Sequence, residues 1–237
     1  MSDRARFIPR VQAGFVPADP DLSSAARRRA IVLWGKPPDV IAIAPGRIEI
    51  VGNHVDYNGG DVLAAAIDRW VVVAGHRRND GLLRVLAADL ASTMMTIPVR
   101  EAREFDARER GFTTGHAHQV GAHAQAAVAA AAAAGIACAG ADLYFRGTIP
   151  QGLGLSSSSA LLTGLVAVIA GLAGEQRERL VLARIAQDAE HRIGAPVGLL
   201  DQISTVVGGY LRFSNDLGRV TVLDAQPLDA VFAVCDS

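Results

Sequence analysis

The chain has 237 residues, half of them hydrophobic, and a formal net charge of -1. This length provides for one large domain or two small ones, and the balanced charge excludes the basic field typical of nucleic-acid or anionic-lipid binding. The two cysteines, Cys138 and Cys235, match neither a metal-binding spacing nor a disulfide framework, so we expect a reducing, cytoplasmic setting.

The first half of the chain is predicted to form one helix followed by several strands. The helix covers residues 23–34 and is ended by Pro37-Pro38. Apolar residues alternate over 40–51 around Pro45-Gly46, which indicates two strands flanking a turn. After these we expect a buried strand over 62–74, a hairpin turn at 79–81 into a strand over 82–87, a strand over 94–99 and a charged loop over 100–110.

The segment from Gly52 to Gly60 is dense in residues that favour turns. It also carries an unusual number of hydrogen-bonding side chains, namely Asn53, His54, Asp56, Tyr57 and Asn58. A plain connection between two strands needs only Asn-Gly. The excess indicates recognition of a small polyhydroxy ligand, and an ordinary exposed polar loop remains the alternative.

An alanine-rich stretch over residues 115–134 is predicted to form a buried helix. Its apolar run is too short for a membrane span, and the N-terminus lacks the apolar region of a signal peptide, so we expect neither. His116, His118 and His123 are not spaced four residues apart, and we therefore expect no metal site there. A strand over 141–147 follows.

Residues 150–161 read Pro-Gln-Gly-Leu-Gly-Leu-Ser-Ser-Ser-Ser-Ala-Leu. Gly152 and Gly154 permit a tight loop, and the serines stand where a helix over 156–173 would begin. The free N–H groups and the positive dipole end of a helix N-terminus suit a phosphate group. The pattern predicts a nucleotide phosphate loop that is neither a Walker A loop nor a dinucleotide fingerprint, and a loop with a simple serine N-cap is the alternative.

The last part of the chain places a carboxylate after a Gly/Pro turn. An amphipathic helix is predicted over 175–191, and Asp201 then stands among apolar residues. A buried carboxylate needs a partner or a function, although a helix cap on residues 203–207 would also explain it. A hairpin of strands 210–214 and 219–223 and a strand over 231–234 complete the predicted elements.

Three separated stretches resemble the motifs of one enzyme family. The stretches at 44–60, 149–158 and 196–202 resemble, in this order, the first motif, the ATP-phosphate motif and the catalytic-Asp segment of sugar kinases in the GHMP superfamily, galactokinases in particular. The resemblance covers roughly residues 40–235. It implies an α+β (mixed α/β) fold, the GHMP-kinase N-terminal lobe of the ribosomal protein S5 domain 2-like type, with a mixed sheet and helices packed on one face.

The resemblance also implies roles for individual residues. Asp201 would be the acid–base residue, and Arg47 would favour its ionised form and a developing alkoxide. The sugar would be held by Asn53, His54, Asp56 and Gly198. The ATP phosphates would be wrapped by Gly152, Gly154, Ser156, Ser157 and Ser158, and Mg²⁺ would be bound by Ser158 and Glu190. The implied reaction transfers a phosphoryl group from ATP to the anomeric hydroxyl of galactose, giving galactose 1-phosphate and ADP, with ATP and Mg²⁺ as cofactors and no nucleic-acid or membrane partner.

Two departures from the family pattern keep other functions open. Asn53 stands where galactokinases usually have Glu, so another sugar such as galacturonate is an alternative substrate. A non-catalytic sugar and ATP sensor on the same fold is a second alternative, against which the intact Asp201 and Arg47 argue. Ser159 stands where the family tends to have Ala, which is a conservative exchange.

The superfamily's third glycine-rich motif is not found in this sequence. We therefore expect a single N-terminal domain, with residues 1–38 as an N-terminal segment, residues 39–237 as the substrate and ATP-phosphate lobe, and the C-terminal GHMP domain missing. An inactive fragment is the third alternative. A lobe by itself would expose its inter-lobe face, so we expect low stability or self-association and weak turnover.

Overall fold

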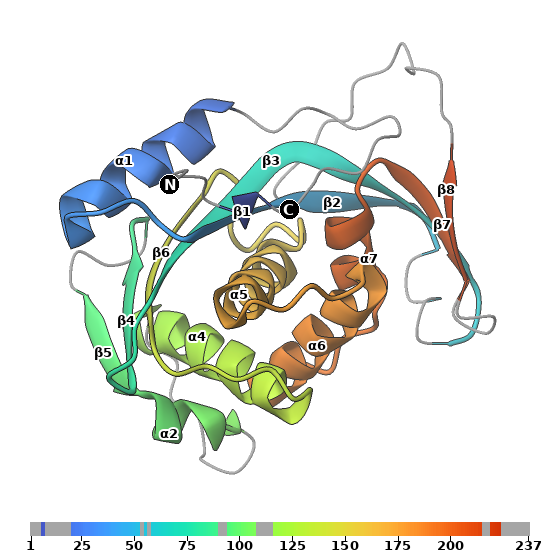
Figure 1. Ribbon diagram of the computed structural model, residues 1–237. Helices are drawn as coiled ribbons and strands as arrows, with labels where there is room; N and C mark the ends of the chain where they lie inside the picture. Colours follow the sequence, from blue (N-terminus) through green and yellow to red (C-terminus); the bar gives the residue numbers. More distant parts are fainter. Residues whose placement is uncertain are drawn as a thin grey trace.

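The computed structural model describes residues 6–7, 20–52, 55, 58–89, 94–107, 116–214 and 219–223, which form a mixed sheet with helices on both faces (Figure 1). The strands are β1 (Arg6–Phe7), β2 (Val40–Val51), β3 (Asp61–Arg77), β4 (Leu82–Ala87), β5 (Met95–Pro98), β6 (Ala141–Gly147), β7 (Tyr210–Ser214) and β8 (Arg219–Leu223). The helices are α1 (Pro20–Trp34), α2 (Val99–Arg103), α4 (His116–Ala133), α5 (Ser157–Ala173), α6 (Arg179–Arg192) and α7 (Leu200–Val207).

The strand order is β1-β2-β3-β6-β4-β5, and the β7-β8 hairpin pairs with the first residues of β3. The predicted hairpin of β3 and β4 is wrong, because β6 lies between them, antiparallel to β3 and parallel to β4. The turn at 79–81 exists, but Arg78 N–H and Gly81 N–H donate to the carbonyls of Gly140 and Ala139 on the segment entering β6. A turn signal in the local sequence cannot show that a later strand, β6, will lie between the two strands that the turn connects.

The predicted turn at Pro45-Gly46 is also wrong, because β2 runs without interruption from Val40 to Val51. Its pairing with β3 shifts register between Pro45 and Arg47, which marks a β-bulge. Proline has no N–H to donate to a sheet and is accommodated at such irregularities. The bulge is important below because Arg47 projects from it.

Helices α4, α5, α6 and α7 cover one face of the sheet, with α5 at the centre (Figure 1). Most of α5 is buried, because its residues are apolar on all sides of the helix. Two glycines let it lie against the strands, because a Cβ at Gly164 or Gly171 would come within 2.8 Å of Val73 or 2.9 Å of Val40. The predicted mixed sheet with helices is confirmed.

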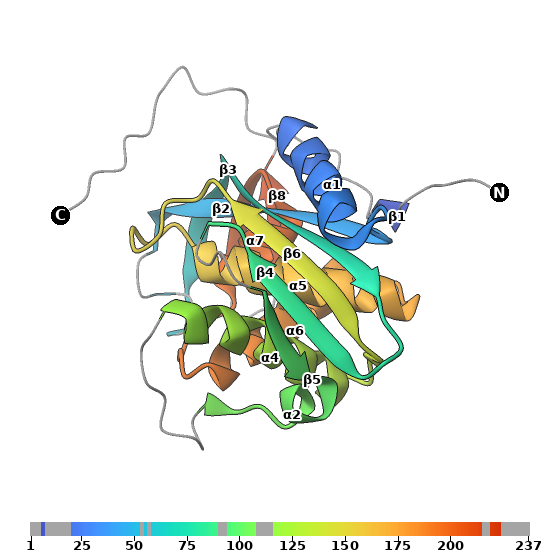
Figure 2. The same ribbon diagram turned by 90° about the vertical axis from the view of Figure 1, so that its left-hand side faces the viewer.

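Helix α1 packs on the opposite face of the sheet, which departs from the expectation of helices on one face only (Figure 2). Its buried Leu22 and Ala26 join a second apolar cluster with Trp70 on β3 and Tyr144 on β6. Because strand side chains alternate between faces, these bulky residues would expose a large apolar surface without a covering helix.

The other predicted elements agree with the structure within a few residues, with one exception. The charged stretch 100–110, expected to be a loop, begins with α2, whose Val99 and Ala102 are buried. The predicted strand over 231–234 and the turn between β7 and β8 lie outside the described residues. Cys138 is a buried free thiol, and burial raises its pKa.

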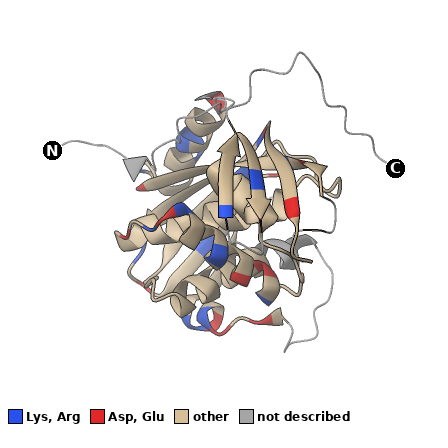
Figure 3. Cartoon of the chain, turned by 90° about the vertical axis from the view of Figure 1, so that its right-hand side faces the viewer, with Lys and Arg blue, Asp and Glu red and all other residues tan. Residues whose placement is uncertain are grey.

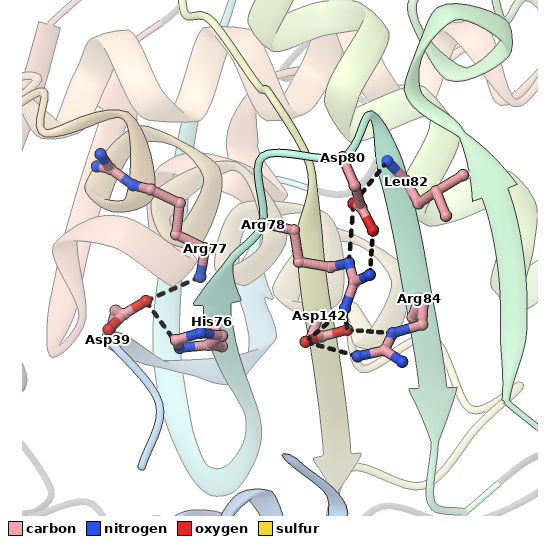
Figure 4. Close-up of polar contacts among 8 residues, drawn as sticks. All are labelled: Asp39, His76, Arg77, Arg78, Asp80, Leu82, Arg84 and Asp142. Atoms are coloured by element: carbon pink, nitrogen blue, oxygen red, sulfur yellow. Dashed lines mark hydrogen bonds and ion pairs between the residues drawn. The ribbon is translucent and has the colours of Figure 1, made fainter. Parts of the chain in front are cut away.

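A buried ion-pair cluster joins three segments of the outer sheet face (Figure 4). Asp142 on β6, only 2 % exposed, accepts hydrogen bonds from Arg84 on β4 at 2.6 and 3.1 Å and from Arg78, directly after β3, at 3.3 and 3.4 Å. Two guanidinium groups therefore neutralise this carboxylate. On the side of the molecule that carries β7 and β8, the positions of acidic and basic residues are interspersed along the chain (Figure 3).

Among the described residues, no helix has both the length and the apolar character needed to cross a membrane.

Candidate active site

The bulge in β2 lies directly against the serine loop that precedes α5. Arg47 N–H donates to the carbonyl of Leu155 at 3.2 Å. A Cβ at Gly46 would come within 2.8 Å of the same carbonyl oxygen, so only glycine permits this approach. The contact fixes the loop next to the side chain of Arg47.

Arg47 and Asp201, which are 154 residues apart in the sequence, meet at this point. Arg47 Nε donates to Asp201 Oδ1 at 2.8 Å, and Nη2 lies 2.7 Å from the same oxygen. Arg47 Nη1 donates to the carbonyl of Gly154 in the serine loop at 2.5 Å. One guanidinium therefore holds both the carboxylate and the loop, and the two side chains remain 13 % and 22 % exposed.

Helix α7 is docked so that Asp201 faces Arg47. Thr205 Oγ1 donates to the carbonyl of Pro45 in the bulge at 3.2 Å. Asp201 lies four residues earlier and hence on the same face of α7. The helix-cap alternative for Asp201 is wrong, because Leu199 is the N-cap residue and Asp201 lies within the first turn.

The serine loop adopts the backbone that its glycines allow. Gly152 and Gly154 have φ of 78° and 66°, and a Cβ at either would meet nothing within 4 Å, so backbone conformation rather than space selects glycine. Ser156 also lies in the left-handed region, at φ 59° and ψ 39°, at a cost of about 1 kcal/mol for a residue with a Cβ.

Ser156 occupies the N-cap position of α5, yet its hydroxyl makes no capping hydrogen bond. It donates instead to Asp201 Oδ2 at 2.6 Å. The simple serine-cap alternative is therefore wrong. The loop, Arg47 and Asp201 form one hydrogen-bonded unit, which we call the Asp201 cluster.

A second polar cluster lies in the interior next to the first. Glu190 on α6, 5 % exposed, accepts hydrogen bonds at Oε2 from Ser159 Oγ at 2.7 Å and from Gln202 Nε2 at 2.5 Å. Burial raises the pKa of the Glu190 carboxyl above its ordinary value. Hydrogen bonds from Ser159, Gln202 and Ser158 oppose that rise of the pKa, and the negative charge of Asp201 adds to it. We call Ser159, Glu190 and Gln202 the Glu190 cluster.

A pocket of about 300 Å³ opens beside the serine loop. Its walls combine apolar residues of the sheet, such as Val71 and Phe145, with Gly152 in the serine loop and Ser158 in the first turn of α5. His123 of α4 also lines it, with Nε2 3.1 Å from Ser158 Oγ. The pocket therefore has an apolar floor and polar groups beside the predicted phosphate loop, an arrangement typical of small-molecule sites.

The structure places some of the sequence-predicted site residues and leaves others undescribed. Asn53, His54 and Asp56 lie outside the described residues, in the connection between β2 and β3. Gly198 lies two residues before the start of α7. Arg47, Asp201, Gly154 and Ser156 meet in one cluster, whereas Ser158 and Glu190 lie at its interior side.

Sequence reasoning missed the polar contacts in the interior. Ser159 had no role beyond the serine run, Gln202 had none at all, and His123 was weighed only as a metal ligand. The sequence did offer one indication of these contacts. Ser159 and Gln202 are polar residues in apolar helices, and each directly follows a candidate site residue, Ser158 or Asp201.

The donor set fits a magnesium ion. Mg²⁺ prefers hard oxygen ligands and is commonly bound through one or two carboxylates together with substrate phosphates. The Ser158 hydroxyl and the Glu190 carboxylate are such ligands, next to the predicted phosphate loop. The partners of Glu190 within the described residues are neutral donors, so no cation in that set balances its charge.

Comparisons with known proteins point to one family. Residues 32–77 match the model of the galactokinase galactose-binding signature, and residues 122–209 match that of the GHMP kinases N terminal domain. The galactokinase of Streptomyces coelicolor is 34% identical over 174 residues, which cover 73% of this chain and 42% of that protein. The galactokinase of Roseiflexus sp. is 35% identical over 214 residues, covering 86% and 50%.

Solved structures share the fold. The Lactococcus lactis galactokinase complexed with galactose superposes with a TM-score of 0.72 at 23% identity, covering 84% of this chain and 50% of that one. The mevalonate kinase of Methanococcus jannaschii gives a TM-score of 0.64 at 16% identity, covering 78% and 56%. The chain spans about half the length of the curated relatives it matches. With two family models in chain order and galactokinase relatives above 30% identity, this chain belongs to the GHMP kinase superfamily and is similar to galactokinases.

Proposed function

We propose that this chain is the substrate- and ATP-phosphate-binding N-terminal domain of a galactokinase-type enzyme, which transfers the γ-phosphoryl group of ATP to the anomeric hydroxyl of galactose. The Asp201 cluster carries the proposal, because it combines a carboxylate, a guanidinium and a phosphate-type loop within hydrogen-bonding distance. Phosphoryl transfer depends mainly on positioning and charge stabilisation, which these groups can supply.

In the proposed reaction, Asp201 orients the anomeric hydroxyl and accepts its proton. Arg47 holds Asp201 through Nε and Nη2 and places positive charge beside the developing alkoxide. Ser156 donates to the second carboxylate oxygen and fixes its plane until substrate binds. Asn53, His54, Asp56 and Gly198 are proposed to hold the sugar hydroxyls.

ATP is proposed to bind with its phosphates along Gly152 to Ser158 and with its nucleoside in the pocket lined by His123. The backbone N–H groups at the start of α5 suit the phosphate charge. Ser158 and Glu190 would bind Mg²⁺, which would neutralise charge on the β- and γ-phosphates.

The test compares galactose binding with galactose-dependent ADP release, in wild type and in Asp201→Asn. We expect the variant to lose turnover by about 100-fold or more while its galactose dissociation constant, measured by calorimetry, changes little. Asp188→Asn, on the exposed side of α6 in an ion pair with Arg192, is the control and should change neither. Equal losses of binding and turnover would show that Asp201 mainly holds the ligand. A wild-type chain that binds galactose and ATP without releasing ADP would favour the sensor or the inactive fragment over the kinase.

A further inference from the structure

The buried carboxylate of Glu190 is held from two other helices at once. Ser159 Oγ reaches Oε2 from α5 and Gln202 Nε2 reaches it from α7, while Glu190 itself belongs to α6. Ser159 and Gln202 are 1 % and 0 % exposed. Both donors converge on the same oxygen, so one carboxylate atom joins three helices.

Packing alone does not account for this choice of residues. Burying a carboxylate costs several kcal/mol unless charge and hydrogen bonds compensate, and apolar residues of similar volume often stabilise such a position. In the described part of the chain, Gln202 Oε1 is buried without a hydrogen-bond partner, which is a further cost. A methionine at position 202 would avoid that cost, so the feature gained by the glutamine is its N–H donor to Glu190.

Ser159 and Gln202 are each adjacent in the sequence to a proposed functional residue. Ser159 directly follows Ser158, a proposed Mg²⁺ ligand, and Gln202 directly follows Asp201, the proposed acid–base residue. Any shift of α5 or α7 therefore moves one of these groups together with its neighbour. Partners outside the ligand set commonly orient a metal-binding side chain in this manner.

We infer that Ser159 and Gln202 are positioning residues for Glu190: they occupy its Oε2, fix the orientation of the carboxylate, and leave the lone pairs of Oε1 for the magnesium ion of the nucleotide complex. This inference rests on the proposed function. Neither residue touches the reacting atoms, and both act through Glu190.

The experiment measures binding of mant-ATP to the full 237-residue chain by fluorescence, first in EDTA and then across a Mg²⁺ titration. Ser159→Ala and Gln202→Met each remove one donor to Glu190 at similar or slightly smaller volume. We expect the Mg²⁺ concentration for half-maximal nucleotide binding to rise about tenfold in each variant. Metal-free binding of mant-ATP should stay within about twofold of wild type, because the phosphate loop is unchanged.

Ser204→Ala is the matched control. Ser204 is also a buried serine hydroxyl, on the same helix as Gln202, but it donates within its own helix to the carbonyl of Leu200 at 2.8 Å. It should leave the Mg²⁺ titration unchanged. Urea unfolding of all variants reports a merely structural role, which would lower the unfolding midpoint without moving the Mg²⁺ titration.

If Mg²⁺ strengthens mant-ATP binding to the wild-type chain and the Mg²⁺ titration is the same in Ser159→Ala and Gln202→Met, this inference is overturned and the proposed Mg²⁺ site is not. Equal weakening of metal-free and Mg²⁺-dependent binding would also overturn it, because it would reveal general damage to the nucleotide site. A wild-type chain that binds mant-ATP without any effect of Mg²⁺ would overturn the proposed Mg²⁺ site and this inference with it. If Gln202→Met does not fold, Ser159→Ala decides the outcome, since it removes only one oxygen atom.

Discussion

Two buried carboxylates of this chain are held in different ways. Asp142 on the outer face of the sheet has two guanidinium partners, Arg78 and Arg84 (Figure 4). Glu190 on α6 accepts hydrogen bonds from hydroxyl and amide groups. The nearby charge of Asp201 is also negative and therefore disfavours the ionised form of Glu190. The first carboxylate is neutralised by the fold. The second is hydrogen-bonded but has no neutralising partner among the described residues, as expected of the proposed Mg²⁺ ligand.

The largest expected effect on the free energy of unfolding comes from replacing Asp142, the carboxylate with arginine partners. Asp142→Asn takes the carboxylate partner away from Arg84 and leaves Arg78 with Asp80 as an acidic partner. We expect the free energy of unfolding to fall by about 2 kcal/mol, below the usual range for buried pairs because both arginines are partly exposed. Urea unfolding measures it. Asp68→Asn, which removes an exposed ion pair with Arg69, should cost less than about 0.5 kcal/mol. Similar losses in both variants would mean that Asp142 acts as a surface charge.

The second prediction concerns Glu190→Gln, which keeps the shape of the side chain and removes its charge. Because the charged form is disfavoured by burial, we expect an unfolding free energy equal to or above that of wild type in the absence of metal. The Mg²⁺ concentration for half-maximal mant-ATP binding should rise about tenfold or more, equivalent to about 1.4 kcal/mol. A loss of stability as large as that of Asp142→Asn, with an unchanged Mg²⁺ requirement, would remove the distinction between the two carboxylates.

The smallest expected effect is a pH dependence on the Asp142 side of the molecule. Burial lowers the pKa of His76 below its ordinary value of 6.5. The charges of Asp39 and Asp142 act against this lowering of the pKa, and those of Lys36 and Arg78 add to it. The unfolded chain therefore binds the proton more readily than the folded one. Stability should be fully present above about pH 6.5 and should decline as the pH falls through the lowered pKa.

Urea unfolding at about pH 7.5 and about pH 5.5 measures this dependence in wild type and in His76→Gln. The variant should lose less stability on acidification than wild type does. Asp142→Asn should lose more, because it removes a charge that favours the protonated histidine. Identical pH profiles in all three proteins would show that His76 has the same pKa in the folded and unfolded chain.

Much of the candidate site could be predicted from the sequence because its signals are local. Glycines spaced by one residue before a serine run indicate a loop with positive φ, and the structure confirms φ of 78° at Gly152 and 66° at Gly154. The β6 strand was predicted with the bounds that the structure has, Ala141–Gly147. Asp201 stood out as a carboxylate among apolar residues. Each of these signals depends on residues within one turn or one strand.

Only the tertiary structure decided which of these groups meet and through which contacts. The Arg47–Asp201 pair spans 154 positions, and the bond from Ser159 to Glu190 spans 31, so no local preference encodes either one. The insertion of β6 between β3 and β4, the bulge that replaces the predicted turn at Pro45, and the packing of α1 on the second face follow from strand pairing and burial across the whole sheet. By itself, the sequence determined the residue types of the proposed phosphate loop and of the proposed acid–base site. The fold determined that Ser156 faces Asp201 and that Ser159 and Gln202 hold Glu190, because a buried polar group takes its partner from whichever element packs against it.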